Sequence, residues 1–296
     1  MSAEATVAQQ PSDMGPAETQ PSTVVIQPTR GWASLKLRDV WRYRELLFFL
    51  VWRDVKVRYK QTALGVTWII LQPLLSMVVF SVLFGTLLQV PSGGVPYPIF
   101  SFAALLPWNY FAGSLGRSST SLVNSAHLIT KVYFPRLIIP LSGVLAGLVD
   151  FAVAFLVLIG LMLYYGVALT PAAAFVPAFL LLAILTASGF GLWLSALNVR
   201  FRDVNYLIPF LLQVWMYLTP VIYGSTLVPE RFRFLLGLNP MTSVVEGFRW
   251  ALLGHQLTDA QPAGPLFALS IGIALLVLVS GVVFFRRTER IFADII

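Results

Sequence analysis

The chain has 296 residues, of which 57% are hydrophobic and only 11% are charged. Soluble domains of average composition carry about 25% charged residues. This composition, with a mean hydropathy of +0.80, therefore excludes a water-soluble globule and predicts an all-α polytopic membrane protein. The net charge of +7 comes from basic residues between apolar runs, which favours a role in membrane topology over nucleic-acid binding. The chain has no cysteine and only two histidines, His127 and His255, so we expect no disulfide, no thiol nucleophile and no metal centre.

Residues 1–31 differ from the rest of the chain. They contain Pro11, Pro16, Pro21 and Pro28 among small and polar residues, and few large apolar ones. Such a composition predicts a disordered, Pro-rich cytoplasmic tail. It contains no apolar h-region, so we expect no signal peptide here.

An apolar run at residues 46–51 is flanked on both sides by basic residues within 41–60. The run is far shorter than the ~20 residues that a helix needs to span a bilayer. We therefore interpret residues 41–60 as an amphipathic interface helix on the inner membrane surface.

Six stretches within residues 64–285 are long and apolar enough to cross the membrane. They lie near residues 64–90, 97–117, 138–165, 171–197, 206–224 and 265–285. An even number of spans places both termini on one side, and all but three of the 20 lysines and arginines fall on that side. The positive-inside rule then predicts cytoplasmic termini, with residues 286–296 as a cytoplasmic C-terminal tail.

The third outer segment, residues 225–264, is too long and too apolar for a free loop. Gly237 is expected to end one short helix. Asn239 and Pro240 suit the N-cap and first position of a second helix, which Gly254 would end. We expect two short helices that re-enter the outer leaflet; the alternative is a pair of helices lying flat on the surface.

The chain lacks the usual sequence motifs of nucleotide binding and catalysis. None of its lysines follows a glycine, so it has no P-loop, and it has neither His-Glu-x-x-His nor Gly-x-Ser-x-Gly. We expect no catalytic residue and no cofactor in this chain. Any ATP and Mg²⁺ would be bound by a separate ATPase subunit.

Asp150 is the one acid expected deep in a span. It lies about 18 Å from the start of the third span, at 1.5 Å per residue. An ionisable group at such a depth is a functional candidate by default. The alternative, which we favour because no basic residue lies inside a predicted span, is a structural Asp that is neutral or hydrogen-bonded to a neighbouring helix.

Aromatic and amide side chains occur in three of the spans: those of the first and fifth spans share a helical face, and those of the second follow one another in the middle of the span. They are Trp68 and Gln72 in the first span, Trp108, Asn109 and Tyr110 in the second, and Tyr206, Phe210, Gln213 and Tyr217 in the fifth. Rings offer apolar faces that tolerate sliding, and amides exchange hydrogen bonds with hydroxyls. The set suits a path for a sugar chain, and the alternative is ordinary helix packing with interfacial aromatic belts.

Two cytoplasmic segments are candidates for contact with a partner. Residues 118–134 have apolar side chains at helical spacing, and residues 198–205 read Asn-Val-Arg-Phe-Arg-Asp-Val-Asn. The spacing alone leaves open whether they dock on a protein or are solvated turns with topogenic charge.

Four blocks resemble the permease subunits of ABC-2-type polysaccharide exporters, the family that exports O-antigen, capsule and teichoic acid. They are Tyr-Lys-Gln-Thr-Ala-Leu-Gly at 59–65, leading to Trp68 and Pro73; Leu-Pro-Trp-Asn-Tyr-Phe at 106–111; Arg-Phe-Arg-Asp-Val at 200–204; and Leu-Asn-Pro-Met at 238–241, leading to Glu246 and Arg249. The blocks occur in the family's order and spacing, and the resemblance extends from about residue 41 to the C-terminus.

The resemblance implies a half-transporter in the bacterial cytoplasmic (inner) membrane. Such a permease is a multi-pass homodimer that works with two copies of a separate ABC ATPase, and its substrate is a lipid-linked glycan. The resemblance also implies roles for named residues. The ATPase-coupling residues would be His127, Lys131, Arg136, Arg200, Arg202 and Asp203, and the outer gate would contain Asn239, Pro240, Glu246 and Arg249.

Other functions remain open from the sequence. A related ABC-2 exporter of a small drug or lipid would share this fold. An ion-coupled secondary carrier would need no ATPase and would depend on Asp150. A scaffold protein without transport would use its aromatic faces for packing alone.

Overall fold

The chain is described by a computed structural model that covers residues 37–60, 65–131, 133–254 and 264–292. Within these residues every regular element is a helix, which agrees with the predicted all-α class. The predicted tail at residues 1–31 lies outside the described residues. So do His255, residues 61–64 of the first resemblance block and the end of the predicted C-terminal tail, residues 293–296.

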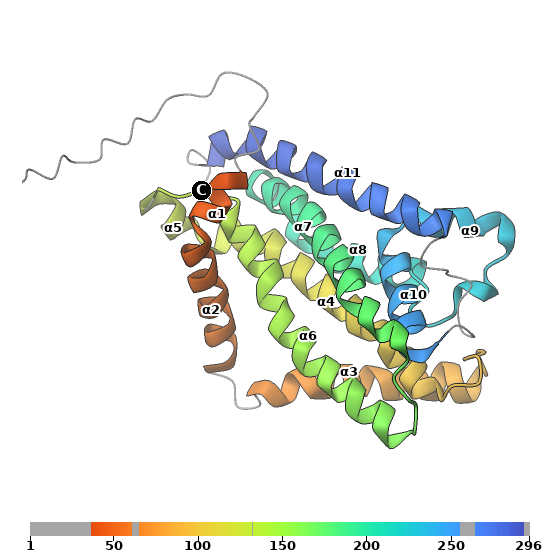
Figure 1. Cartoon of the computed structure of the whole chain (residues 1–296). Coiled ribbons are helices and arrows are strands. Elements are labelled where there is room, and N and C mark those ends of the chain that lie inside the picture. Colours follow the sequence, from red (N-terminus) through yellow and green to blue (C-terminus); the bar gives the residue numbers. More distant parts are fainter. Residues whose placement is uncertain (1–36, 61–64, 132, 255–263, 293–296) are drawn as a thin grey trace, which may run out of the picture. The chain divides into compact units, whose positions relative to one another are not determined.

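The helices follow one another in the order of Figure 1. They are α1 (Leu37–Arg42), α2 (Arg44–Lys60), α3 (Gly65–Phe80), the π-helix η1 (Ser81–Leu87), α4 (Tyr97–Asn124), α5 (Ala126–Lys131), α6 (Ile138–Tyr164), η2 (Pro171–Phe175), α7 (Val176–Arg200), α8 (Val204–Leu218), η3 (Ser225–Leu227), α9 (Glu230–Gly237), α10 (Pro240–Leu253), α11 (Pro265–Thr288) and η5 (Glu289–Ile291).

Four helical stretches in the described part are long and apolar enough to cross a membrane, so the chain is a multi-pass membrane protein. They are Thr67–Leu87, Ile138–Tyr164, Pro171–Arg200 and Pro265–Thr288. These match the first, third, fourth and sixth predicted spans. The fifth is represented by α8, a shorter apolar helix. The second is represented by α4, which has 28 residues and includes polar positions such as Asn109.

The ends of α4 and α8 differ from the predicted spans. α4 continues past residue 117 to Asn124, so Arg117 lies within this helix. In this Ser-rich part of the helix the hydroxyls are satisfied by bonding back along the helix, as Ser121 Oγ does to the carbonyl of Ser118 at 2.7 Å. α8 ends at Leu218 and not near residue 224, because Pro220 keeps Thr219 in an extended conformation.

α4 lies at the centre of the helical packing. It packs against α3, α6, α7, α8 and α10, while α7 also packs against α11. Its fully buried side chains include Phe102, Leu105 and Phe111. This central position explains why α4 carries polar residues in the middle of its length: many of them meet protein instead of lipid.

α2 packs against α6, with α1 preceding it (Figure 1). Leu50 is buried against the other helices, whereas Phe48, Phe49 and Trp52 are exposed on one face. Lys56 and Lys60 are exposed as well. A break at Tyr43 separates α1 from α2, so residues 41–60 are not one continuous helix, and their place at the membrane surface stays a prediction.

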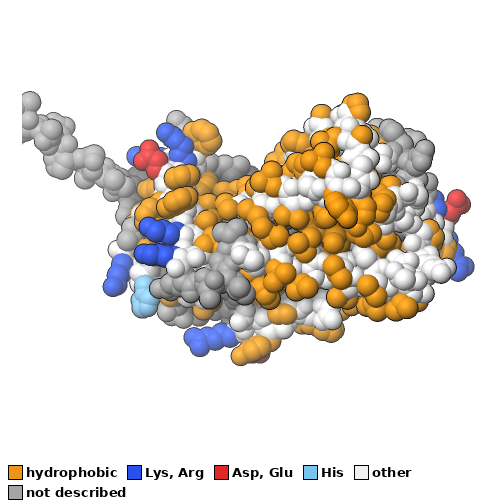
Figure 2. All heavy atoms as spheres, turned by 90° about the horizontal axis from the view of Figure 1, so that it is seen from below, with side chains coloured by type: hydrophobic (Ala, Val, Ile, Leu, Met, Phe, Trp, Pro, Cys, Tyr) orange, Lys and Arg blue, Asp and Glu red, His pale blue; other side chains and the backbone are white. Residues whose placement is uncertain are grey.

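Charged and hydrophobic side chains occupy different parts of the molecular surface. Figure 2 shows Lys and Arg side chains at the two ends of the molecule and hydrophobic side chains over the stretch between them. Exposed apolar residues on this scale, including Leu156 and Leu276 at 67% and 66%, are what a lipid-facing surface requires.

The two short outer helices begin and end where the sequence predicts. α9 ends at Gly237, and the side chain of Asn239 caps α10 by accepting from the backbone N–H of Met241 at 3.1 Å. Gly254 ends α10 with φ = 95°, a left-handed conformation that glycine adopts without strain. α10 is buried against α4 and α7. Residues 255–263 of this segment lie outside the described part.

Candidate functional site

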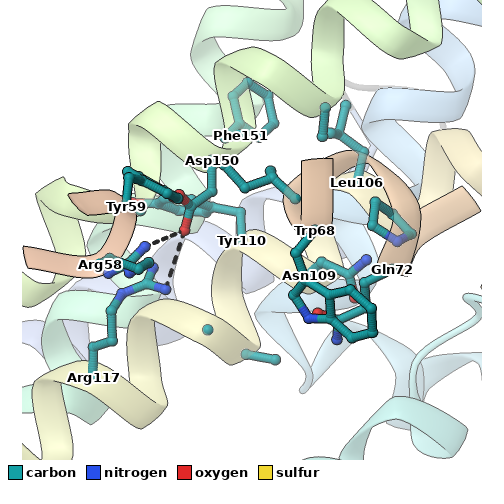
Figure 3. Close-up of a pocket in the computed structure, with 16 residues that line it drawn as sticks. Arg58, Tyr59, Trp68, Gln72, Leu106, Asn109, Tyr110, Arg117, Asp150 and Phe151 are labelled. Carbon is teal, nitrogen blue, oxygen red and sulfur yellow. Dashed lines mark hydrogen bonds and ion pairs between the residues drawn. The ribbon is translucent and has the colours of Figure 1, made fainter. Parts of the chain in front are cut away.

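The principal cavity of the described chain has a volume of about 680 Å³. The end of α2, the first half of α3, α4 and α6 form its walls. In Figure 3, Arg58, Tyr59, Arg117 and Asp150 form one end of the cavity, and Trp68, Gln72 and Asn109 lie at the other. The cavity thus has a charged end and an end made of a ring and two amides.

Four of the residues predicted to line a sugar path meet in this cavity. They are Trp68 and Gln72 from α3 and Asn109 and Tyr110 from α4. The Tyr110 ring packs edge-on against the ring of Phe151, with centroids 5.9 Å apart. Helices α3 and α4 therefore bring together residues from two separate blocks of the sequence, and both blocks were predicted to contribute to the path.

Trp108 does not line the cavity. Only 3% of its surface is exposed, and its ring packs against Phe111, which in turn contacts Trp215 on α8. Consecutive residues of a helix are about 100° apart, so Trp108 and Asn109 face different neighbours. Within this chain Trp108 contributes to the packing of α4 against α8.

The four predicted path residues of α8 lie apart from the cavity on an exposed face. Tyr206, Phe210 and Tyr217 are 82%, 61% and 55% exposed, and Gln213 is exposed as well. The predicted helical face of aromatic and amide groups therefore exists, and among the described residues it is exposed and not packed against another helix.

A charged cluster occupies the other end of the cavity. Asp150 Oδ2 accepts from Arg58 Nη1 at 2.5 Å and from Arg117 Nη1 at 3.4 Å, and Asp150 Oδ1 accepts from the Tyr59 hydroxyl (Figure 3). Arg117 also donates through Nε to the carbonyl of Gly143 at 3.1 Å. Three helices, α2, α4 and α6, thus meet at one carboxylate.

Asp150 is therefore hydrogen-bonded to neighbouring helices, as the structural interpretation predicted. Arg117, predicted at the end of the second span, lies within the longer helix α4, which brings its guanidinium to Asp150. The sequence contained one signal for this cluster, a basic residue near the end of the interface helix, but no local pattern linked it to Asp150.

Tyr59 acts as a donor in this cluster. Burial raises the pKa of its hydroxyl, and both the hydrogen bond to Asp150 and the charge of that carboxylate raise it further. The phenol therefore remains protonated throughout the physiological range and keeps donating to Asp150.

The first three predicted coupling residues lie in α5 or in the segment that joins it to α6. His127 lines a cavity of about 450 Å³ beneath α2, which also contains Asp54 and Ser142. Lys131 and Arg136 line a smaller depression of about 310 Å³. Arg136 donates from Nη1 to the backbone carbonyl of Glu289, and so connects the start of α6 to the end of α11.

The second set of coupling residues occupies the junction of α7 and α8. Arg200 ends α7 with its guanidinium 5.2 Å from the centroid of the Phe201 ring. Arg202 and Asp203 follow and are exposed. Asp203 occupies the N-cap position of α8 without a side-chain capping bond, so both side chains are free to meet another protein.

The predicted gate residues hold the outer segment together. Arg249 is completely buried and lies 3.8 Å above the ring centroid of Phe100. It donates to the carbonyls of Pro220, Val221 and Tyr223 at 2.6, 2.5 and 2.9 Å, and to that of Phe100 at 3.3 Å. One side chain of α10 thus satisfies the non-helical backbone that follows α8.

Glu246 and Asn239 bind the same region. Glu246, one turn before Arg249, accepts from the backbone N–H and the hydroxyl of Ser225 at 3.0 and 2.6 Å. Asn239 accepts from Trp215 Nε1 at 2.9 Å and donates to Thr219 Oγ1 at 2.8 Å, and Pro240 is buried at the first position of α10. Asn239, Glu246 and Arg249 thus fix α10 to the end of α8 and the segment that follows it.

The profile of a family described as ABC-2 type transporter matches residues 45–253. The chain belongs to this family. The match covers every helix from α2 to α10, so the cavity and the outer segment both lie within the ABC-2 region, and the resemblance read from the four sequence blocks is confirmed.

Similar ABC-2 proteins carry names from polysaccharide export. The chain is 34% identical to an "O-antigen export system permease protein RfbA" of Myxococcus xanthus, over 86% of this chain and 96% of the relative. It is 30% identical to a protein of the same name from Klebsiella pneumoniae, over 85% and 95% of the two chains. It is 24% identical to the "Polysialic acid transport protein KpsM" of Escherichia coli, over 75% and 89%.

Proposed function

We propose that this chain is the membrane-spanning permease subunit of an ABC exporter that moves a lipid-linked polysaccharide across the bacterial cytoplasmic membrane. The observation that carries the proposal is the 34% identity with an O-antigen export permease over 96% of that protein. The cavity supports it, because its tryptophan, tyrosine and two amides are the groups that bind sugars through ring faces and hydroxyls.

The proposed topology has six spans, with both termini in the cytoplasm. α4 and α8 would serve as the second and fifth spans, although one is less apolar and the other is shorter than the ~20 residues usual for a crossing. The polar residues of α4 are tolerated at membrane depth because α4 is buried among other helices. The short length of α8 is tolerated because Arg249 hydrogen-bonds the polar backbone that follows it. The positive-inside distribution of basic residues supports the orientation.

The proposed assembly is a homodimer with two copies of a separate ATPase, which would bind ATP and Mg²⁺. Two exposed regions support this assembly. One is the aromatic face of α8, which a second copy would cover to complete the path. The other comprises Lys131, Arg202 and Asp203, whose exposed charges are available to an ATPase.

The mechanism that follows is mechanical. Closure of the ATPases on ATP would move the coupling residues, among them Lys131, Arg136 and Arg202. The two permeases would then part along α3 and α8, and the glycan would advance over the exposed rings of Tyr206 and Tyr217. This chain would form the path and transmit the motion of the ATPases to it, and would need no catalytic residue.

Deleting the gene for this chain should remove the long-chain polysaccharide from the cell surface and leave lipid-linked polymer inside the cell. The reason is that polymer synthesis precedes export and does not need the permease. Surface polymer is measured on intact cells and the internal pool after lysis, with the wild-type gene on a plasmid as the rescue control. Normal surface polysaccharide with failed efflux of a small drug or lipid would favour the alternative ABC-2 exporter.

Replacing Arg202 and Asp203 together by Ala should lower export by about tenfold or more, in the range of typical coupling energies between sites. Both side chains are exposed and hold no helix together, so insertion into the membrane should be unchanged. Export is measured beside the amount of permease in the membrane and the amount of co-purifying ATPase. Glu230→Ala with Arg231→Ala, an exposed pair on α9, is the matched control.

Normal export by the Arg202 and Asp203 double variant would show that these residues do not couple the permease to its ATPase.

The ion-coupled carrier is another alternative. It would require Asp150 to exchange ions, yet this carboxylate is held by two arginines and a tyrosine. We therefore give Asp150 no ion-coupling role.

A further inference from the structure

The charged end of the main cavity carries an excess of positive charge. Among the described residues that line the cavity, Arg58, Arg117 and Asp150 are the charged ones. Two guanidiniums thus face one carboxylate, which leaves a net charge of +1 in a partly buried site. The side chains of the three residues are only 30%, 26% and 25% exposed.

Nearby charges do not cancel this excess. Arg53 and Asp54 of α2 pair with each other at 2.8 Å, and Asp54 also accepts from Ser142 at 3.3 Å. Lys56 and Lys60, on the same helix, are exposed and basic. The surroundings of the cluster therefore add positive charge or are neutral as pairs, and an anion in the cavity would be stabilised.

The groups that bind Asp150 are those that bind phosphate esters. A guanidinium presents planar donors that match the oxygens of phosphate as well as those of a carboxylate. Arg58 and Arg117 approach one oxygen of Asp150 from different helices, and the Tyr59 hydroxyl approaches the other (Figure 3). The carboxylate oxygens thus occupy positions in which phosphate oxygens would be equally well bound.

An apolar strip continues from the same cavity along α3. Trp68 and Gln72 line the cavity, and Leu75 and Val79 continue their helical face at a spacing of three and four residues. Leu75 and Val79 are each 50% exposed. A phosphate in the charged end would therefore lie near a lipid-facing apolar strip on one side and sugar-binding rings on the other.

We propose that Arg58 and Arg117, assisted by Tyr59, bind the phosphate or diphosphate group that joins the glycan to its lipid carrier, and that Asp150 occupies these donors until the lipid arrives. This inference rests on the proposed function and names a binding site within it. Asp150 is then a competing anion within the chain, and its removal should favour the ligand.

The test measures binding of a labelled polyprenyl diphosphate that carries no sugar. The full transporter, purified with its ATPase, is placed in nanodiscs of a zwitterionic lipid and titrated with this lipid and with the corresponding uncharged polyprenol. We expect the diphosphate to bind at least ~10-fold more tightly than the polyprenol, because hydrogen bonds to charged groups contribute factors of that size.

Two variants should shift this affinity in opposite directions. Arg58→Gln removes a donor and should weaken binding of the diphosphate by about 10- to 100-fold. Asp150→Asn removes the competing carboxylate and should strengthen it. Lys56→Gln removes an exposed charge of the same helix and should leave it unchanged. A structural ion pair predicts a loss of equal size from either partner, so equal losses in Arg58→Gln and Asp150→Asn would overturn the proposal.

Competition separates the sources of phosphate. Displacement of the label by inorganic pyrophosphate would show that the anion is sufficient for recognition. Displacement by unlabelled polyprenyl diphosphate but not by pyrophosphate would show that the lipid chain contributes to binding. Both outcomes support the site. Displacement by phosphatidylglycerol at the same mole fraction would assign it to bulk membrane lipid and overturn the proposal. Equal binding of polyprenol and diphosphate to wild-type protein would also overturn it.

Failure of this inference differs from failure of the proposed function. If the gene deletion abolishes surface polysaccharide while Arg58→Gln binds the diphosphate normally, the exporter assignment stands and the phosphate site is wrong. If Asp150→Asn does not fold, the comparison of Arg58→Gln with Lys56→Gln and of diphosphate with polyprenol still decides the proposal. The amount of monodisperse transporter is recorded for each variant.

Discussion

Replacing Arg249 by Met should lower the free energy of unfolding by at least ~3 kcal/mol, because breaking a buried charged network costs this much or more. Arg249 is fully buried and donates to the carbonyls of Phe100, Pro220, Val221 and Tyr223. Met keeps the aliphatic stem but has no donor. Each carbonyl left without a partner adds about 1–3 kcal/mol to the cost.

The measurement is equilibrium unfolding of the purified permease in mixed micelles, followed by tryptophan fluorescence. Arg231→Met is the matched control, because Arg231 is an exposed arginine on α9 that lies 4.8 Å from the ring centroid of Phe232. We expect the control to change stability by less than ~0.5 kcal/mol. An Arg249→Met protein as stable as wild type would show that residues 219–225 do not depend on this guanidinium.

The prediction also revises the role of the outer gate residues. From the family resemblance they were expected to form a gate, and the structure adds that Asn239, Glu246 and Arg249 each bind the chain between α8 and α9. Any opening on the outer side must therefore move α10 together with the end of α8, or break several buried hydrogen bonds at once.

The outer segment was predictable from sequence because its signals are local. Gly237, Asn239, Pro240 and Gly254 mark helix ends through backbone conformation and capping, which depend on a few neighbouring residues. The structure has these ends where the residues predict them. The four apolar spans were predictable for a similar reason, since length and hydropathy are properties of a single segment.

The charged cluster was not predictable in the same way. Arg58, Arg117 and Asp150 come from three helices, and the pairs are separated by 92 and 33 residues in sequence. No periodicity relates such positions. The second span was predicted to end near residue 117, whereas α4 continues to Asn124, so no pattern in the sequence indicated that Arg117 lies beside Asp150.

The residues predicted to line one sugar path lie in three different environments in the structure. Helical spacing shows which side chains share a face, but does not say what that face meets. Trp68, Gln72 and Asn109 face a cavity within the chain, Trp108 faces the core, and the α8 residues face outward. The proposed homodimer gives the α8 face a partner, and so relates both sets to one path.

Replacing Gly281 by Ala should destabilise the chain by about 1–3 kcal/mol, the usual cost of overpacking. A Cβ at Gly281 would lie 2.5 Å from the backbone oxygen of Gly189 and 3.1 Å from the Trp193 ring. Gly189, in turn, has the backbone of Leu278 within 2.9 Å of its own Cβ position. The shortest of these contacts are with backbone, so α7 and α11 must separate to accept the methyl group.

Gly272→Ala is the control on the same helix, because its Cβ would meet nothing within 4 Å. Ala is a better helix former than Gly by about 1 kcal/mol, so this variant should be neutral or slightly more stable. Both are compared with wild type by the unfolding assay used for Arg249, and opposite signs for the two substitutions are the expected result. If both stabilise the chain equally, the close approach of α7 and α11 at Gly189 and Gly281 is not what holds these two helices together.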